Sequence, residues 1–192
     1  NAPVPAKRSF RSGGVGWEEV TGEWSLRLEG PEAKEPVIIV PGILGTKLNK
    51  VSDGSEVWPN GPVLFSSSTD SFLDFLILDS VGVPRAGFGV NPSDISREVV
   101  VLGNKKIVYG NLIDSLKNRG YQEGIDLFVA PYDWRLDIAA STQRLSAIVT
   151  EALKYSSTGK VNIIAHSMGG LLVKKYLQPL SSTNFVNKLV LV

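Results

Sequence analysis

A serine flanked by small residues is the feature of this 192-residue sequence that is best suited to covalent chemistry. A β-branched, apolar run leads into it and a segment with helical spacing follows it: Ile163-Ile164-Ala165-His166-Ser167-Met168-Gly169-Gly170. This is the pattern of a nucleophile elbow, G-x-S-x-G, with Ala165 in place of the first glycine. The pattern predicts that Ser167 is a nucleophile on a strained strand-to-helix turn. The alternative is that Ser167 only caps a helix.

A serine hydroxyl needs partners before it can attack an ester at neutral pH. It needs a base, usually an acid that orients the base, and hydrogen-bond donors for the developing oxyanion. The backbone N–H of Met168 is one candidate donor. We expect the second donor from Ile43, because the glycines of Pro41-Gly42-Ile43-Leu44-Gly45-Thr46 allow a close backbone approach. The alternative is that Pro41-Gly42 is only a turn after a buried strand.

The base is missing from the pattern. His166 is the only histidine in the sequence. Neighbouring side chains on so tight a turn point in different directions, so its ring cannot easily reach the hydroxyl of Ser167. We therefore expect His166 to be packed or bonded to the backbone.

Two aromatic clusters lie elsewhere in the sequence. Pro131-Tyr132-Asp133-Trp134-Arg135 follows an apolar run, and strand ends in open α/β sheets border the active crevice. We expect Tyr132, Asp133, Trp134 and Arg135 to give structural support near the site, as an ion pair with aromatic packing. The second cluster supplies candidates for a lid or substrate-binding surface: Trp58, Phe72 and Phe75. The alternative for this second cluster is an ordinary core helix.

Alternating strand and helix patterns predict the architecture that positions these residues. Val37–Val40 is an uninterrupted β-branched run, as expected of a parallel strand buried on both faces. The further expected elements are strands at 125–130, 161–165 and 188–192, and helices around 112–120, 137–157 and 168–177. This order predicts an α/β fold with a mostly parallel sheet and helices on both faces.

The remaining segments are predicted to lie outside this sheet. Residues 1–35 are expected to be an N-terminal linker, with 1–16 a disordered lead-in and a short hairpin from Trp17–Val20 and Trp24–Leu28. Residues 45–109 are expected to be a cap or lid insertion, with 45–95 its least regular part. Gly103-Asn104 predicts a hairpin near the end of the insertion.

The composition excludes several classes of function. A net charge of +1 without a dense basic run gives no drive toward nucleic acid. The absence of cysteine excludes disulfides, thiolate chemistry and cysteine-based zinc sites. The longest apolar stretch, near Phe75–Leu78, is far shorter than the roughly 20 residues of a membrane span. We expect no transmembrane segment, no metal and no cofactor.

Three motifs in one order resemble the lecithin:cholesterol acyltransferase family, which includes lysosomal phospholipase A2 and phospholipid:diacylglycerol acyltransferases. They are Val40-Pro41-Gly42-Ile43-Leu44-Gly45-Thr46-Lys47-Leu48, Ala130-Pro131-Tyr132-Asp133-Trp134-Arg135 and Ala165-His166-Ser167-Met168-Gly169. The resemblance implies an α/β-hydrolase fold over residues 36–192, a lid around Trp58 and a Ser-Asp-His triad. It makes Ser167 the nucleophile and Met168 and Ile43 the oxyanion donors. The family's triad Asp and His follow later strands and have no counterpart here.

The resemblance implies a serine-dependent lipid acyl hydrolase or O-acyltransferase. An acyl-Ser167 intermediate would pass a fatty acyl group from a phospholipid or other lipid ester to an alcohol or water, at a membrane or lipoprotein-like surface. We expect the chain to be truncated and inactive by itself. The alternatives are a catalytically dead lipid-binding module, or a carboxylesterase or thioesterase on the same scaffold. The lack of the cysteines that pin the lid in some animal members suggests a microbial or simplified relative. An extracellular or membrane-peripheral place in a microbe is favoured over the cytoplasm.

Overall fold

The computed structural model describes residues 9–12, 15–20, 23–28, 34–59, 70–101, 104–179 and 182–192. The chain forms two compact units, residues 1–34 and 35–192. The first unit is a three-stranded antiparallel sheet in the order β1 (Ser9–Ser12), β2 (Val15–Val20), β3 (Glu23–Leu28). The predicted hairpin is confirmed as β2 and β3. The prediction of a disordered lead-in is wrong for β1. The short polar sequence of β1 gives no strand signal, and its backbone pairs with β2. Residues 1–8 lie outside the described part.

A four-stranded parallel sheet lies at the centre of the second unit. Its order is β10 (Leu127–Val129), β4 (Val37–Val40), β11 (Val161–Ala165), β12 (Val186–Leu191). Every residue of β4 is buried, because the strand has neighbours on both edges and helices over both faces. The predicted α/β fold with a parallel sheet is confirmed. β10 begins two residues later than predicted, because the N–H groups of residues 125–127 all turn back to the carbonyl of Gln122.

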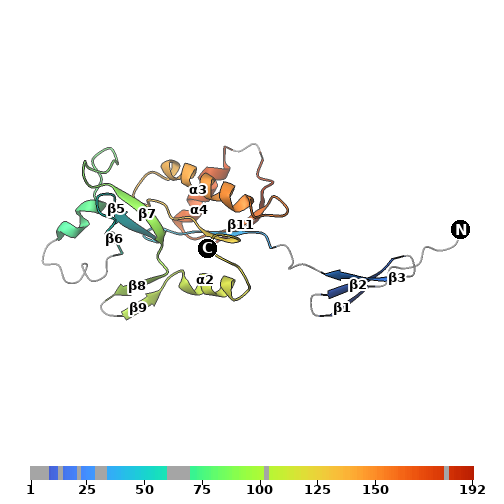
Figure 1. Cartoon of the computed structure of the whole chain (residues 1–192). Coiled ribbons are helices and arrows are strands. Elements are labelled where there is room, and N and C mark those ends of the chain that lie inside the picture. Colours follow the sequence, from blue (N-terminus) through green and yellow to red (C-terminus); the bar gives the residue numbers. More distant parts are fainter. Residues whose placement is uncertain are drawn as a thin grey trace. The chain divides into compact units, whose positions relative to one another are not determined.

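Helices cover both faces of this sheet (Figure 1). α3 (Ile138–Leu153) and α4 (Met168–Leu177) lie on one face, and α2 (Gly110–Lys117) lies on the other. Alternate residues of β4 point to opposite faces. Ile38 therefore joins the cluster that contains Leu145 and Leu172, whereas Ile39 joins the one that contains Ile113.

The long helix has one clear signal at each end. The side chain of Asp137 caps α3 by accepting a hydrogen bond from the N–H of Ala139, 2.6 Å away. The predicted helix at 137–157 ends four residues early, at Leu153. After Leu153 the backbone N–H groups form i→i−3 hydrogen bonds as far as Ser156. Gly159 then has a positive φ.

The insertion between β4 and α2 is more regular than predicted. Three antiparallel strands form a second sheet in the order β6 (Glu56–Trp58), β5 (Thr46–Lys50), β7 (Val90–Ile95). The prediction of irregular structure at 45–95 is wrong here, because β5 pairs with a strand about forty residues away and no local pattern records that. A 3₁₀ helix, η1 (Asp70–Leu76), lies between β6 and β7. A hairpin is confirmed as β8 (Glu98–Val101) and β9 (Asn104–Ile107), but the turn predicted at Gly103-Asn104 is wrong, because Asn104 already belongs to β9 and pairs with Val101.

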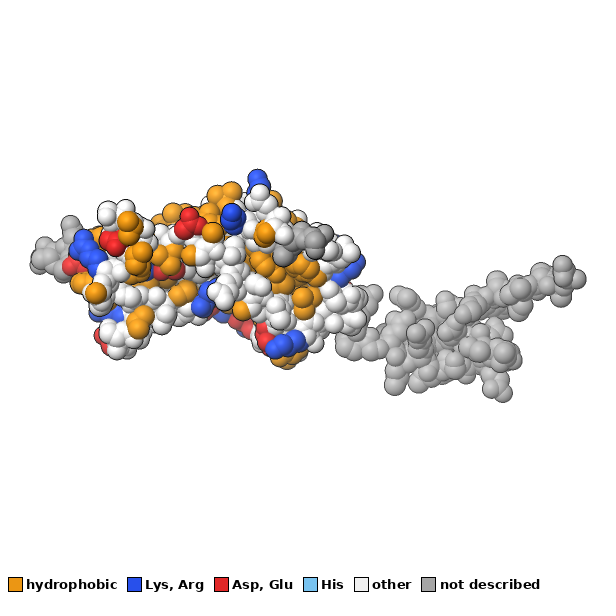
Figure 2. Space-filling model, turned by 90° about the horizontal axis from the view of Figure 1, so that it is seen from above, with side chains coloured by type: hydrophobic (Ala, Val, Ile, Leu, Met, Phe, Trp, Pro, Cys, Tyr) orange, Lys and Arg blue, Asp and Glu red, His pale blue; other side chains and the backbone are white. Residues whose placement is uncertain are grey.

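No helix among the described residues is both long enough and apolar enough to cross a membrane. Figure 2 views the second unit from the side of α3 and α4. On this face Lys, Arg, Asp and Glu side chains are scattered singly among hydrophobic ones. The described residues on this face therefore form no basic patch of the kind that holds a nucleic-acid backbone.

Candidate active site

The turn after β11 holds Ser167 in a strained conformation. Its φ is +52° and its ψ is −123°, and the only other described non-glycine residue with a positive φ is Leu44. Such conformations cost about 1–3 kcal/mol and persist only where the surroundings impose them. Here the N–H of His166 donates to the carbonyl of Val40 at 3.0 Å, and the N–H of Ser167 donates to that of Val192 at 2.8 Å. The backbone on either side of β11 therefore fixes the turn, and Ser167 stays exposed.

Two glycines let the elbow and the loop after β4 touch. A Cβ on Gly169 would lie 2.5 Å from the carbonyl oxygen of Pro41 and 2.7 Å from that of Val40. A Cβ on Gly42 would lie 3.0 Å from the Cβ of Ser167. The start of α4 and the loop after β4 thus pack backbone against backbone, directly beside the serine. This close approach is the reason for glycine at both positions.

The loop after β4 is a type II turn. The N–H of Gly45 donates to the carbonyl of Gly42 at 3.1 Å, and Leu44, the third residue of the turn, has a φ of +60°. Ile43 occupies the second position, with its side chain 56% exposed. Within the described parts of the chain, the N–H groups of Ile43 and Met168 have no hydrogen-bond acceptor. Free backbone donors beside a serine are what an oxyanion requires.

Three aromatic side chains from distant segments hold this turn. The hydroxyl of Tyr109 accepts a hydrogen bond from the N–H of Gly42 at 2.9 Å. The indole N–H of Trp58 donates to the carbonyl of Leu44 at 2.8 Å, and that of Trp134 donates to the carbonyl of Thr46 at 3.3 Å. The two indoles also meet edge to face, with centroids 5.8 Å apart. Trp58, a candidate lid residue, therefore links the insertion between β4 and α2, called the cap below, to the loop.

The Pro-Tyr-Asp-Trp-Arg segment packs under the same loop. The N–H of Tyr132 donates to Oγ1 of Thr46 at 3.2 Å. The guanidinium of Arg135 binds both carboxylate oxygens of Asp133, at 2.9 and 2.7 Å, with its Nη1 donating to the carbonyl of Phe75. Both charged side chains are buried, with 3% of Arg135 and 8% of Asp133 exposed. This ion pair connects the loop support to η1.

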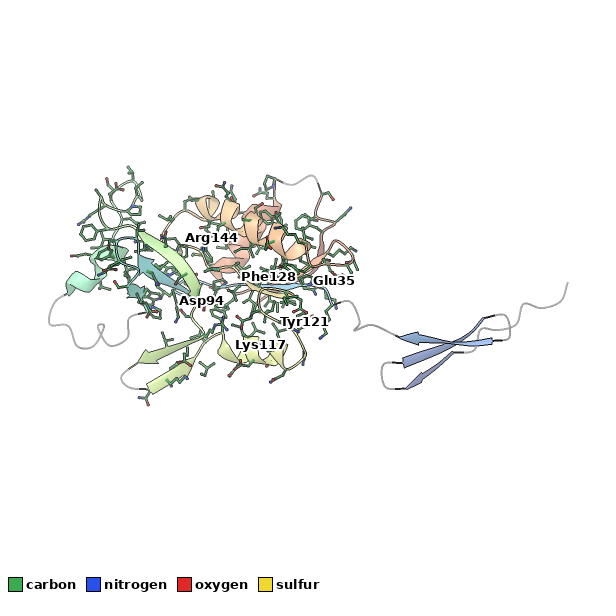
Figure 3. The ribbon with its side chains drawn as sticks, in the orientation of Figure 1. Glu35, Asp94, Lys117, Tyr121, Phe128 and Arg144 are labelled. Atoms are coloured by element: carbon green, nitrogen blue, oxygen red, sulfur yellow. The ribbon has the colours of Figure 1, made fainter. Side chains whose placement is uncertain are left out.

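Two further side chains complete the surroundings of this segment. Arg144, labelled on α3 in Figure 3, donates to the carbonyl of Pro131 at 2.6 Å and to that of Pro92 at 2.9 Å. The hydroxyl of Tyr132 is buried and has no partner among the described residues. Burial raises the pKa of this hydroxyl well above its usual range.

His166 contacts a residue that the sequence did not single out. Its Nδ1 lies 2.9 Å from the hydroxyl of Tyr109, and the two rings meet edge to face. His166 is itself exposed, and its ring is held by a side chain and not by the backbone, so the prediction of a packed or backbone-bonded histidine is wrong. Burial raises the pKa of Tyr109, and the hydrogen bond from Gly42 opposes that shift. No local sequence pattern indicates that residue 109 contacts residues 42 and 166. This contact is therefore seen only in the folded structure.

The surface beside the serine is apolar. An open groove of about 590 Å³ includes Ser167 and is lined by leucines of α4 and β12: Leu171, Leu177, Leu189 and Leu191. Of the other two candidate lid residues, Phe75 packs within the cap against Phe88, with Lys50 Nζ 4.7 Å from its ring centroid. The side chain of Phe72 lies outside the described residues. No group of three or more metal-binding side chains occurs in the described parts of the chain.

A parallel sheet with a strained serine elbow beside a loop with free N–H groups defines a protein of the α/β-hydrolase class. The chain belongs to the lecithin:cholesterol acyltransferase family, whose model matches residues 84–191. It is 28% identical over 164 residues to lecithin-cholesterol acyltransferase-like 4 of Arabidopsis thaliana, covering 74% of this chain and 30% of that protein. It is 27% identical over 174 residues to lysosomal phospholipase A and acyltransferase of Mus musculus, covering 74% and 42%.

Among solved structures, a chain of the Tle4–Tli4 complex matches 82% of this chain and 45% of its own length, with a TM-score of 0.44 and 17% identity. The chain thus spans less than half the length of each of these proteins.

Proposed function

We propose that this chain carries the nucleophile and the oxyanion donors of a serine-dependent lipid acyl hydrolase or O-acyltransferase. The observation that supports this most is Ser167 at a φ of +52°, next to a loop whose Ile43 N–H has no acceptor among the described residues. A second free N–H, from Met168, follows the serine directly, as it does in nucleophile elbows. Together these groups fit the attack of a hydroxyl on an ester carbonyl.

In the proposed reaction Oγ of Ser167 bonds to the ester carbonyl carbon while its proton passes to a base. The carbonyl oxygen becomes an oxyanion that accepts hydrogen bonds from the N–H groups of Ile43 and Met168. Collapse of this intermediate breaks the ester C–O bond, and the leaving alcohol takes up the proton. Water or an acceptor alcohol then attacks acyl-Ser167 in the same manner.

The base is proposed to come from outside these 192 residues. His166 is the only histidine in the chain, and its Nδ1 is bonded to the hydroxyl of Tyr109. That contact occupies Nδ1, so this nitrogen is not available to take the proton of Ser167. We therefore expect the 192-residue chain alone to turn over esters very slowly, if the triad partners lie elsewhere in the gene product.

Lipid esters are the proposed substrates. The relatives are named as a lecithin-cholesterol acyltransferase-like protein and a phospholipase A and acyltransferase. The surface of the groove beside Ser167 is mostly apolar, with four leucines among its ten lining residues, which suits a fatty acyl chain better than a polar group. A membrane or lipoprotein-like surface, outside the cell or at its periphery, is the proposed place of action.

The test is release of fatty acid from phosphatidylcholine vesicles by the whole gene product. We expect Ser167→Ala to lower kcat more than about 1000-fold. The matched control is Ser115→Ala, which removes an exposed hydroxyl from α2 and should leave kcat unchanged. Lipid binding without turnover in the unsubstituted protein would favour a catalytically dead lipid-binding module. Turnover of short soluble esters or thioesters with none on vesicles would favour a carboxylesterase or thioesterase.

A further inference from the structure

We propose that Tyr109 is a positioning residue that sets the oxyanion loop against the nucleophile elbow through its hydroxyl. This inference rests on the proposed function. The hydroxyl lies 2.9 Å from the N–H of Gly42, in the loop after β4, and 2.9 Å from Nδ1 of His166, in the elbow after β11. One oxygen atom thus bridges the two segments that carry the proposed donors and the nucleophile.

The available donors and acceptors determine which atoms of this bridge carry the protons. The N–H of Gly42 can only donate, so the oxygen of Tyr109 accepts there. The phenolic proton needs an acceptor of its own, and Nδ1 of His166 is its only other partner among the described residues. If Nδ1 carried a proton, the phenolic proton would be buried without a partner, which is costly. The neutral ring of His166 therefore carries its proton on Nε2.

The surroundings of Tyr109 hold its side chain in place. Only 7% of it is exposed, and its N–H donates to the carbonyl of Ser96 at 3.3 Å. α2 begins at the next residue, Gly110, whose N–H donates to the carbonyl of Arg97 at 2.9 Å. The ring fits closely under the turn, because a Cβ on Gly45 would lie 3.0 Å from its Cε2. The hydroxyl therefore has little freedom to move.

The bridge also decides which backbone donors are available. The N–H of Gly42 is used by Tyr109, so the N–H without an acceptor in the described structure is that of the next residue, Ile43. Without the hydroxyl, the N–H of Gly42 would lose its partner, and the Pro41–Gly42 peptide, which leads into the turn, could rotate. Rotation would move the donor of Ile43 relative to Oγ of Ser167. Small displacements of such groups lower the rate of the chemical step more than they lower substrate affinity.

The kinetic test compares Tyr109→Phe with Tyr155→Phe in the whole gene product, using a short-chain ester and phosphatidylcholine vesicles. Tyr109→Phe keeps the ring and removes the bridging oxygen, and we expect kcat to fall about 10-fold with KM within twofold. Tyr155 is an exposed tyrosine that packs on Phe128, and Tyr155→Phe should change neither constant. The proposal would be overturned if Tyr109→Phe kept kcat within twofold of the unsubstituted enzyme. It would also be overturned if KM rose by the same factor as kcat fell.

A second measurement does not depend on turnover. Nitrogen NMR of the imidazole, with the His166 signals assigned by their loss in His166→Gln, reports which ring nitrogen carries the proton. We expect the Nε2–H form in the unsubstituted protein and a mixture of both forms in Tyr109→Phe. A proton on Nδ1 in the unsubstituted protein would overturn the bridge. If Ser167→Ala kept full turnover, the proposed function would fail and the positioning role with it, while the NMR result would still decide the hydrogen bond.

Discussion

The elbow after β11 and the loop after β4 lie side by side but are held in place in different ways. The elbow is fixed by backbone hydrogen bonds to its flanking segments, with no side-chain cap on α4. The loop carries a comparably unusual residue, Leu44 at a φ of +60°. Besides its own backbone turn bond, however, three of its backbone groups are held by side chains: Trp58 from β6, Tyr109 from the start of α2 and Trp134 from the segment after β10.

The conformation of the elbow is specified by the local sequence, whereas the conformation of the loop depends on the rest of the fold. Small residues around a serine between a strand and a helix are enough to produce the elbow. The loop needs residues that lie between 14 and 88 positions away in the chain. We infer that substitutions in the elbow change only the elbow. Substitutions in the cap and in the Pro-Tyr-Asp-Trp-Arg segment change the conformation of the loop, and through it the position of the proposed oxyanion donor.

The largest expected effect comes from breaking the buried ion pair below the loop. Asp133→Ala leaves the guanidinium of Arg135 buried without its carboxylate, and we expect the free energy of unfolding to fall by about 4 kcal/mol. Urea denaturation measures this. Glu151→Ala is the control, because the pair of Glu151 with Lys154 is solvent-exposed and should contribute little to stability. Equal losses for the two variants would contradict the support role of Asp133.

The contact between the elbow and the loop is tested at Gly169. In Gly169→Ala the new methyl group meets the backbone carbonyls of Pro41 and Val40, which cannot move without shifting β4. We expect a loss of about 3 kcal/mol in the free energy of unfolding. Gly170→Ala is the matched control, since its nearest atom is Cδ2 of Leu191 at 3.4 Å and alanine favours the helix. A tolerated Gly169→Ala would mean that the elbow and the loop are not in close contact.

The role of the loop as a donor is tested by removing one N–H. The second position of a type II turn accepts proline, so Ile43→Pro should keep the turn and delete the donor. We expect kcat of the whole gene product to fall about 100-fold, as for loss of one oxyanion-hole donor. Ile43→Val keeps the N–H and should stay within threefold of the unsubstituted enzyme. If Ile43→Pro behaved like Ile43→Val, the second donor would have to lie elsewhere.

The link from the cap to the loop is tested at Trp58. Trp58→Phe removes the donor to the carbonyl of Leu44 while keeping an aromatic ring against Trp134. We expect a loss of about 1 kcal/mol in the free energy of unfolding. Trp134→Phe removes a longer hydrogen bond, of 3.3 Å, and should cost less. The reverse order would show that the Pro-Tyr-Asp-Trp-Arg segment, and not the cap, sets the conformation of the loop.

The smallest expected effect is at Tyr132, whose buried hydroxyl has no partner in the described structure. Tyr132→Phe removes that unsatisfied group, so we expect the free energy of unfolding to stay the same or to rise by up to about 1 kcal/mol. Thermal unfolding monitored by calorimetry measures the change. A clear loss of stability would reveal a hydrogen-bond partner, such as a buried water, for this hydroxyl.

The sequence predicted the parallel sheet well because its signals are local. The β-branched run at Val37–Val40, the 3.6-residue spacing of α3 and the small residues around Ser167 each record their structure within a few positions. The cap sheet could not be predicted, because β5 and β7 pair across a long separation and β7 contains Pro92, which argues against a strand. Tyr109 was missed for the same reason, since its partners are distant in sequence.

The central claim, that Ser167 is the nucleophile, is tested most directly by covalent labelling. The whole gene product is treated with a fluorophosphonate, and the modified peptide is identified by mass spectrometry. We predict a single adduct on Ser167 that disappears in Ser167→Ala and persists in the control Ser115→Ala. An adduct on another serine, or full lipid turnover with Ser167 unlabelled, would contradict the claim.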